Sequence, residues 1–156
     1  LLKNAIENTP DEGMIRLLIE ENEKRPNLKV QDFGIGITEE NLRYIFDGLF
    51  PTQETDLYMS KNPFDFNAGG KGLDLLRMKA YGQRFGFDLS AESRRCIYLA
   101  TDRDVCPGRI SRCPHCTSRE DCVASGGSIF SVAFQALKES ARVKAHHGTE
   151  ICSVES

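Results

Sequence analysis

Alternating apolar and polar residues predict where the strands of this chain lie. Residues 14–23 and 28–32 show this period of two, interrupted once at Leu18, and the turn-forming residues 24–27 separate them. The two segments are therefore expected to form a hairpin. Apolar residues alternate again at three later places, where we expect further strands: residues 85–89, 97–99 and 129–134.

Helical spacing of the apolar residues predicts helices over residues 1–9 and 39–46, and again from Leu73 onwards. Thr38 is a suitable N-cap for the second helix, because its side chain can accept a hydrogen bond from the first turn. Residues 49–70 contain Gly, Pro, Asn and Asp without a regular period. This is long for a structureless loop in a compact domain, so we expect the segment to be functional or mobile.

The composition sets broad limits on what the chain can be. Its 156 residues suffice for one domain with a buried core. The net charge of −3 argues against a dedicated nucleic-acid-binding protein, which is usually basic. No apolar run reaches transmembrane length, and the N-terminus lacks the pattern of a signal peptide. Because the chain has no initial Met and begins inside an expected helix, we interpret it as a cytoplasmic part of a longer protein, which can itself be anchored in a membrane.

The most informative stretch is Val30-Gln31-Asp32-Phe33-Gly34-Ile35-Gly36-Ile37. It is typical of a buried strand that runs into an Asp-x-Gly-x-Gly turn, where glycine allows a backbone or a flat ligand to come close. Such a turn is common by itself. Here it lies between two further motifs, Leu2-Lys3-Asn4-Ala5-Ile6-Glu7-Asn8-Thr9 upstream and Asn67-Ala68-Gly69-Gly70-Lys71-Gly72-Leu73-Asp74-Leu75-Leu76 downstream.

Together these motifs resemble the ATP-binding catalytic domain of sensor histidine kinases, in the superfamily shared with Hsp90, DNA gyrase B and MutL. The upstream motif is similar to the N box and the Asp-x-Gly-x-Gly turn to the G1 box. Tyr44-Ile45-Phe46-Asp47-Gly48-Leu49-Phe50 is similar to the F box, and Gly70-Lys71-Gly72-Leu73-Asp74-Leu75 to the G2 box. The resemblance covers residues 1–91 and resumes at 127–134, and the order of the four boxes makes it specific.

The resemblance implies an α+β fold of two layers, with a mixed sheet and helices on one of its faces. The ATP-binding domain is then expected over residues 1–135. Within it, residues 51–70 correspond to the ATP lid, and residues 92–126 form a cysteine-rich insertion between two late strands. Residues 136–156 are expected to form a C-terminal helix or tail.

The resemblance also implies roles for individual residues. Asn4 is expected to be catalytic as a Mg²⁺ ligand, since its amide offers the oxygen that this hard cation prefers. Asn8 lies on the same helix face, four residues on. Asp32 is expected to accept a hydrogen bond from the adenine amino group. The full expected nucleotide-binding set is Asn4, Asn8, Asp32, Gly34, Gly36, Ile37, Lys61, Gly70, Lys71, Gly72 and Leu73.

Two positions depart from the family pattern. Asn8 stands where many of these kinases carry an aromatic residue that packs on adenine. Asp74 stands where the pattern prefers a third glycine, and its negative charge near the phosphates could weaken ATP binding. The residue one helical turn before Asn4, which separates kinases from hydrolysing relatives, is not on the chain.

Four cysteines lie close together with the spacing C-x6-C-x2-C-x5-C, namely Cys106, Cys113, Cys116 and Cys122. Thiolates at such spacing suit tetrahedral Zn²⁺, and a short polar segment needs a staple of this kind. We expect Zn²⁺, while an iron–sulfur cluster, disulfides and free thiols are the alternatives. Four cysteines complete a site, so His115 is not expected to be a ligand, and Cys96 is expected to pack in a strand.

The function implied by the resemblance is that of a histidine kinase. Mg·ATP would bind between the N-box helix, the lid and the G2 turn, and the γ-phosphoryl would pass to a histidine on a separate dimerisation domain. The expected partners are that domain, a response regulator and a second copy of the parent protein, and no nucleic acid. One alternative is a dimerising ATPase of the same superfamily. The other is a degenerate domain in which the cysteine insertion serves as a metal-stapled interaction module.

Overall fold

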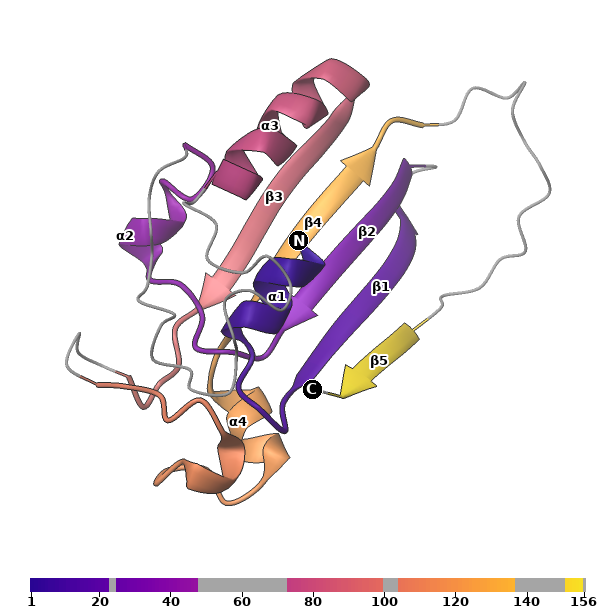
Figure 1. The fold of residues 1–156 in the computed structure, drawn as a ribbon. Coiled ribbons are helices and arrows are strands. Elements are labelled where there is room, and N and C mark those ends of the chain that lie inside the picture. Colours follow the sequence, from indigo (N-terminus) through magenta and orange to yellow (C-terminus); the bar gives the residue numbers. More distant parts are fainter. Residues whose placement is uncertain (23–24, 48–72, 100–103, 137–150, 156) are drawn as a thin grey trace.

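The structure, a computed structural model, describes residues 1–22, 25–47, 73–99, 104–136 and 151–155. A single sheet runs through it with the strand order β3-β4-β2-β1-β5 (Figure 1). Its strands are β1 (Met14–Asn22), β2 (Arg25–Asp32), β3 (Phe87–Arg94), β4 (Gly127–Phe134) and β5 (Ile151–Glu155). Helices pack on the sheet, which confirms the expected α+β class. Every described pair of neighbouring strands is antiparallel, so the expected mixed sheet is wrong for these strands.

The hairpin expected from the alternating residues is confirmed, and it is formed by β1 and β2. Leu17 lies opposite Val30 on the face that the helices cover. On the other face Lys29 and Glu20 form an ion pair of 2.7 Å. The alternation therefore fixes the register, since a slip by one residue would turn the apolar side chains to the wrong face.

The fifth strand corrects the expectation for the end of the chain. Residues Ile151–Glu155 form β5, which pairs antiparallel with β1 and places Cys152 opposite Leu17. A C-terminal helix or loose tail is therefore wrong for these five residues. The physical reason is that the free edge of β1 offers unpaired N–H and C=O groups, to which another strand can add.

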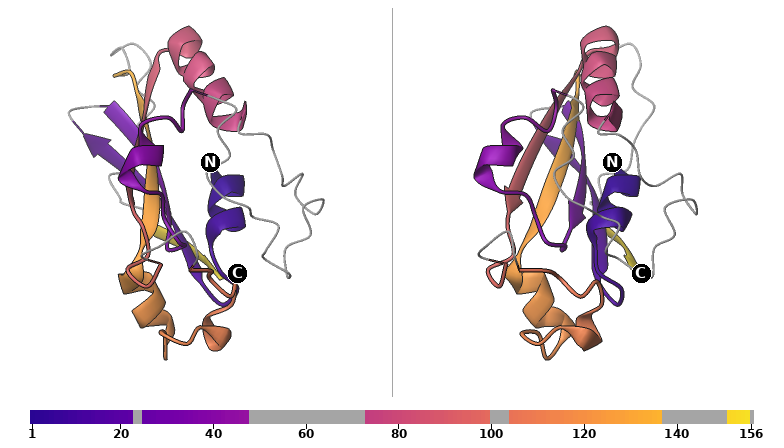
Figure 2. Two further views of the ribbon diagram at one scale, coloured as in Figure 1. Left: turned by 90° about the vertical axis from the view of Figure 1, so that its left-hand side faces the viewer. Right: turned by 60° about the vertical axis from the view of Figure 1, so that its left-hand side comes forward.

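The helices lie mainly on one side of the sheet. Figures 1 and 2 show that α1 (Leu2–Asn8) and α3 (Leu73–Phe85) cover one face, α1 over β2 and α3 along β3. The short helix α2 (Glu39–Leu42) lies beside β3, at the edge of the sheet. Among the described residues, no helix has the length and apolar character needed to cross a membrane.

The core lies between α1 and the covered face of the sheet. Ala5 of α1 is fully buried against Ile15 of β1 and Val30 of β2. Phe130 and Val132 of β4 are buried on the same face, as the alternation over residues 129–134 predicted. This apolar layer fixes where the N-box helix and the end of β2 stand relative to each other.

Two local expectations from the sequence differ from the structure. The helix after Thr38 ends at Leu42 instead of residue 46, although Thr38 caps it as expected, accepting a hydrogen bond of 3.3 Å from the Asn41 N–H. Residues 97–99 form a turn and not a strand, closed by a 3.0 Å bond from the Leu99 N–H to the Cys96 carbonyl. Leu99 is buried there while Ile97 is 60% exposed, so the two apolar residues do not share one buried face as they would in a strand.

The cysteine-rich insertion leaves the sheet after β3 and returns at β4, as expected from the sequence. Its described part contains a single 3₁₀ turn, η2 (Ile110–Arg112), and the helix α4 (Arg119–Ser125). Ser118 caps α4, and Asp121 completes a reciprocal capping box with it. The insertion lies below the end of the sheet where β2 and β3 stop and β4 begins (Figure 1).

Candidate functional site

A row of polar side chains crosses the covered face of the sheet where β2 ends. The strand register places Asp32 opposite Ser128 of β4, and Ser128 opposite Ser93 of β3. Asp32 is only 2% exposed, and its carboxylate accepts a 3.1 Å hydrogen bond from the Gly34 N–H. The backbone N–H and the hydroxyl of Ser128 also favour the charged form of this carboxylate. A buried carboxylate is thus held in a fixed position beside the glycine-rich turn.

Burial raises the pKa of Asp32 from the ordinary value of 3.8 to about 6. Desolvation disfavours the charged form of a carboxyl group, and the hydrogen bonds from Gly34 and Ser128 offset only part of this effect. The side chain is still largely ionised at pH 7. An ionised carboxylate only accepts hydrogen bonds, so it can recognise an amino group on a ligand.

The glycines of the turn are required by the way the protein packs on itself. A Cβ on Gly34 would lie 1.9 Å from the carbonyl oxygen of Asn8, at the end of α1. Gly36 has a φ of +67°, and a Cβ there would lie 2.0 Å from the carbonyl oxygen of Arg94. The two glycines therefore let the turn touch α1 on one side and the end of β3 on the other. Their approach to a nucleotide base stays a prediction.

Two serines connect the ends of the turn, and sequence reasoning missed both. The Ile37 N–H donates a 2.7 Å hydrogen bond to the Ser93 hydroxyl, which donates in turn to the Gly127 carbonyl at 3.0 Å. The hydroxyls of Ser93 and Ser128 lie 2.9 Å apart. The available signal was the position of Ser128 on the apolar face of an expected strand, two residues before Phe130.

Helix α1 carries the two asparagines of the N box, both half-buried. The side-chain amide of Asn8 donates a 2.7 Å hydrogen bond to the backbone carbonyl of Asn4, one turn earlier. Thr9 is fully buried and ends the helix, donating from its hydroxyl to the Ala5 carbonyl at 2.7 Å. Since the end of α1 rests on Gly34, the N box and the G1 box form one unit. The role of Asn4 as a Mg²⁺ ligand stays a prediction.

The first turn of α3 shows how the charge of Asp74 is compensated. Leu73 begins this helix, and Asp74 forms ion pairs with Lys3 of α1 at 3.3 Å and with Arg77 at 3.8 Å. The negative charge that departs from the family pattern is therefore paired with two cations. The other predicted contacts with the phosphates lie outside the described residues, namely Lys61, Gly70, Lys71 and Gly72.

A comparison with family models is consistent with this arrangement of boxes. The model described as histidine kinase-, DNA gyrase B-, and HSP90-like ATPase matches residues 1–136. The chain belongs to this family. A comparison with curated proteins finds no match.

As a HATPase-type domain, the chain is an ATP-binding module, and the family uses ATP together with Mg²⁺. The described residue whose chemistry suits this ligand is Asp32, since its buried carboxylate is a fixed hydrogen-bond acceptor beside the G1 turn. Its contact with adenine stays a prediction. Asn4 would supply an oxygen ligand for the cation.

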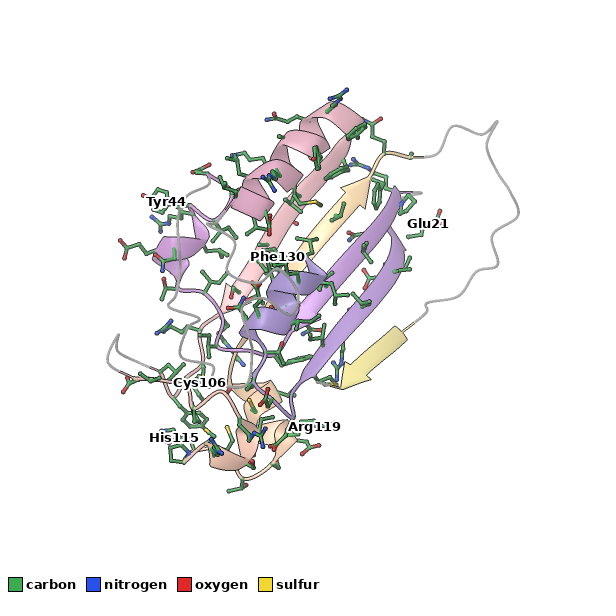
Figure 3. The ribbon with its side chains drawn as sticks, viewed as in Figure 1. Glu21, Tyr44, Cys106, His115, Arg119 and Phe130 are labelled. Carbon is green, nitrogen blue, oxygen red and sulfur yellow. The ribbon has the colours of Figure 1, made fainter. Side chains whose placement is uncertain are left out.

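The insertion brings its four predicted cysteines together. They surround one cavity of about 30 Å³, which is also bordered by Pro10 at the end of α1 and by Gly34 and Ile35 of the G1 turn. The thiol of Cys116 is buried, and Cys113 and Cys122 are the neighbours that contribute, after burial, to its raised pKa. Figure 3 shows Cys106 and His115 together at this end of the molecule, with sulfur atoms beside them.

Cys96 also borders the cavity, and its thiol contacts the Ser125 hydroxyl at 3.4 Å. The expectation that it packs in a strand is wrong, because β3 ends at Arg94. The sequence signal for Cys96 was weak, since it lies ten positions before Cys106.

The chemistry of the cluster is that of free thiols. All five cysteines in the described part are unbridged, so the disulfide alternative is not realised between them. Burial raises the pKa of Cys116 to about 12 and that of Cys122 to about 11, which keeps both thiols neutral at pH 7. As these side chains stand, no group of three or more His, Cys, Asp or Glu in the described residues is arranged to hold a metal ion. His115 stacks on Tyr98, with 4.8 Å between the ring centres.

The insertion is attached to the segment that follows α1. The Asp11 N–H donates to the Gly108 carbonyl at 2.8 Å, and the Ile110 N–H donates to the Asp11 carbonyl at 3.2 Å. Arg109 pairs with the Asp11 carboxylate at 3.1 Å. The N–H and hydroxyl of Ser111 donate to the Glu12 carboxylate at 2.8 and 3.0 Å. No local pattern in the sequence indicates this contact, which joins residues about a hundred positions apart.

Proposed function

We propose that this chain is the catalytic, ATP-binding domain of a sensor histidine kinase. The reaction would transfer the γ-phosphoryl of ATP to a histidine on a separate dimerisation domain of the same protein. A response regulator would then receive the phosphoryl group. Bound Mg²⁺ would neutralise charge on the phosphates, and catalysis in such transfers is largely positioning and charge neutralisation.

The observation that carries the nucleotide part of this proposal is the buried Asp32. Its carboxylate accepts a hydrogen bond from the Gly34 N–H and is only 2% exposed. A carboxylate in this position favours an adenine amino group, because a guanine presents a carbonyl oxygen at the corresponding place. Asn4 on the adjoining helix would hold the cation, and Lys3 keeps the Asp74 carboxylate paired near the start of α3.

Calorimetry with Mg·ATP and Mg·ADP tests the nucleotide site. We expect the wild-type domain to bind both, and Asp32→Asn to lose at least about tenfold in affinity, since a neutral amide is a weaker acceptor than a carboxylate and replaces one acceptor oxygen by a donor. Asp88→Asn is the matched control, because Asp88 is exposed and pairs with Arg25 at 3.0 Å, away from Asp32. A folded wild-type domain that binds no nucleotide would support the degenerate domain instead.

Phosphotransfer assays separate the kinase from the ATPase. We expect no stable label on this domain alone after incubation with γ-labelled ATP, because neither His146 nor His147 lies in a recognisable phosphoacceptor motif. Addition of the protein's own dimerisation domain should produce an acid-labile label on that domain. Release of inorganic phosphate without such a label would identify a hydrolysing member of the family.

A further inference from the structure

The insertion has too little apolar material to hold its own shape. Among its described residues only Leu99, Ile110 and Cys116 are buried hydrophobic side chains. Its regular structure amounts to one 3₁₀ turn and the seven-residue helix α4. Segments of this size that lack a core usually depend on a cross-link, a metal ion or a partner.

The thiols converge at one point from three different parts of the insertion. Cys106 comes from the loop before η2, Cys113 and Cys116 from the loop that follows η2, and Cys122 from α4. All four thiols border the same cavity of about 30 Å³. Four sulfur ligands around Zn²⁺ stand about 3.8 Å apart, given a Zn–S bond of about 2.3 Å. Among the described residues, no three such side chains are arranged to hold an ion as they stand, so the site would form when the thiols turn toward the cavity that they share.

We propose that four cysteines of the insertion bind one Zn²⁺ ion, and that this ion holds the insertion against the nucleotide site. The ligands are Cys106, Cys113, Cys116 and Cys122. A cavity of about 30 Å³ has room for one ion, since a single water molecule needs about 10 to 15 Å³ of such space.

The proposed effect of the ion on the nucleotide site rests on the proposed nucleotide binding. Contacts in the structure connect the cysteine cavity with that site. Gly34 and Ile35 of the G1 turn form one wall of the cysteine cavity. The Ile35 carbonyl accepts a 2.8 Å hydrogen bond from the Cys96 N–H, at the start of the insertion. On the other side, Asp11 and its neighbours tie the insertion to the end of α1. Loss of the ion would therefore loosen both the G1 turn and the end of the N-box helix.

Metal analysis of the reduced, purified protein tests the first half. We expect about one Zn²⁺ per chain, and replacement by Co²⁺ should give the visible spectrum of tetrahedral thiolate ligation. Cys116→Ser should lose the metal, whereas Cys96→Ser, at the same cavity, should keep it. A wild-type protein that stays metal-free after reconstitution with Zn²⁺ overturns the proposal. The proposal is also overturned if Cys96→Ser loses the metal while Cys106→Ser retains it.

Nucleotide titration of the wild-type protein tests the second half without depending on a folded variant. A chelator that removes Zn²⁺ but leaves Mg²⁺ should raise the Kd for Mg·ATP about tenfold, within the range typical of coupled sites, and added Zn²⁺ should restore it. An unchanged Kd after proven loss of zinc overturns the coupling. If the zinc-loaded protein binds no nucleotide at all, the proposed function fails while the metal site stands.

Discussion

The sheet with α1 and the cysteine-rich insertion are held together by different forces. The sheet region buries a continuous apolar layer that includes Ala5, Val30 and Phe130. The insertion relies on capping bonds, on contacts with Asp11 and Glu12, and on a gathering of thiols. Figure 3 shows the contrast, with Phe130 in the middle of the sheet and Cys106, His115 and Arg119 together at its end.

This difference shows how one chain can combine a rigid site on the sheet with an insertion whose support for that site depends on a bound ion. The apolar contacts of the sheet do not depend on a metal ion or on the redox state of the thiols. They therefore hold Asp32 in position whether or not an ion is bound. Contacts that depend on a bound ion are present only when the ion is present. Since the insertion touches the G1 turn and the end of α1, a change there can reach the nucleotide site without disturbing the core.

The comparison is tested most severely by removing a core side chain. Phe130→Ala should lower the free energy of unfolding by about 3 to 5 kcal/mol, because it leaves a cavity between β4 and its neighbours Val30 and Ala91. Urea unfolding measures this loss. Phe134→Ala is the control on the same strand face, and it should cost much less because Phe134 is 41% exposed. Equal losses would contradict the assignment of the core to this layer.

The buried carboxylate gives the next largest effect, through pH. The folded-state pKa of Asp32 is about 6 and its ordinary value is 3.8, so the folded protein binds the proton more tightly. The contribution of Asp32 to the free energy of unfolding is therefore fully present below about pH 4 and is lost as the pH rises through 6. At about 1.4 kcal/mol per pH unit, the loss amounts to about 3 kcal/mol.

Comparing the wild type with Asp32→Asn separates the contribution of Asp32 from that of the other acidic residues. Titration of those residues can change the free energy of unfolding with pH in the opposite direction. The stability of the variant minus that of the wild type should increase between pH 4 and pH 7, as measured by urea unfolding at each pH. A constant difference across that range would mean that Asp32 titrates normally in the folded protein.

A smaller effect is expected from the cap of the insertion helix. Ser118→Ala removes the side chain that accepts from the Asp121 N–H at 3.2 Å and should cost about 1 kcal/mol. Hydrogen exchange should show the loss at the amides of α4 and leave those of β1 and β2 unchanged. Ser131→Ala on β4 is a control outside the insertion. Faster exchange throughout the sheet would show that the two regions unfold together.

The sequence predicted the sheet region better than the insertion, for a physical reason. Alternation identifies strands such as β4 because burial on one face imposes a period of two. The G1 box draws attention to Asp32 because the Asp-x-Gly-x-Gly turn requires particular residues at neighbouring positions. Register and antiparallel pairing, including β5 on the edge of β1, depend on contacts between distant segments. The link between Asp11 and Arg109 and the position of Cys96 are likewise set by tertiary packing, which no local pattern encodes.

The smallest effect concerns the contact between the two regions. Arg109→Ala removes the ion pairs with Asp11 at 3.1 Å and with Glu12 at 4.0 Å but leaves the cysteines and the backbone hydrogen bonds of the Asp11 segment in place. Because the Arg109 side chain is 44% exposed, each pair is worth at most about 1 kcal/mol. The Kd for Mg·ATP should rise about two- to fivefold, and the zinc content should not change.

Arg112→Ala is the matched control for this variant, since it removes the same charge from the same segment. Among the described residues, no ion pair involves the Arg112 side chain, and Arg112 is exposed. We expect its Kd for Mg·ATP to equal that of the wild type when both are measured by calorimetry at the same ionic strength. If both variants weaken binding equally, the cause is the general loss of positive charge. If only Arg109→Ala does so, the contacts of Arg109 with Asp11 and Glu12 carry the coupling, and the insertion acts on the nucleotide site through the segment that follows α1.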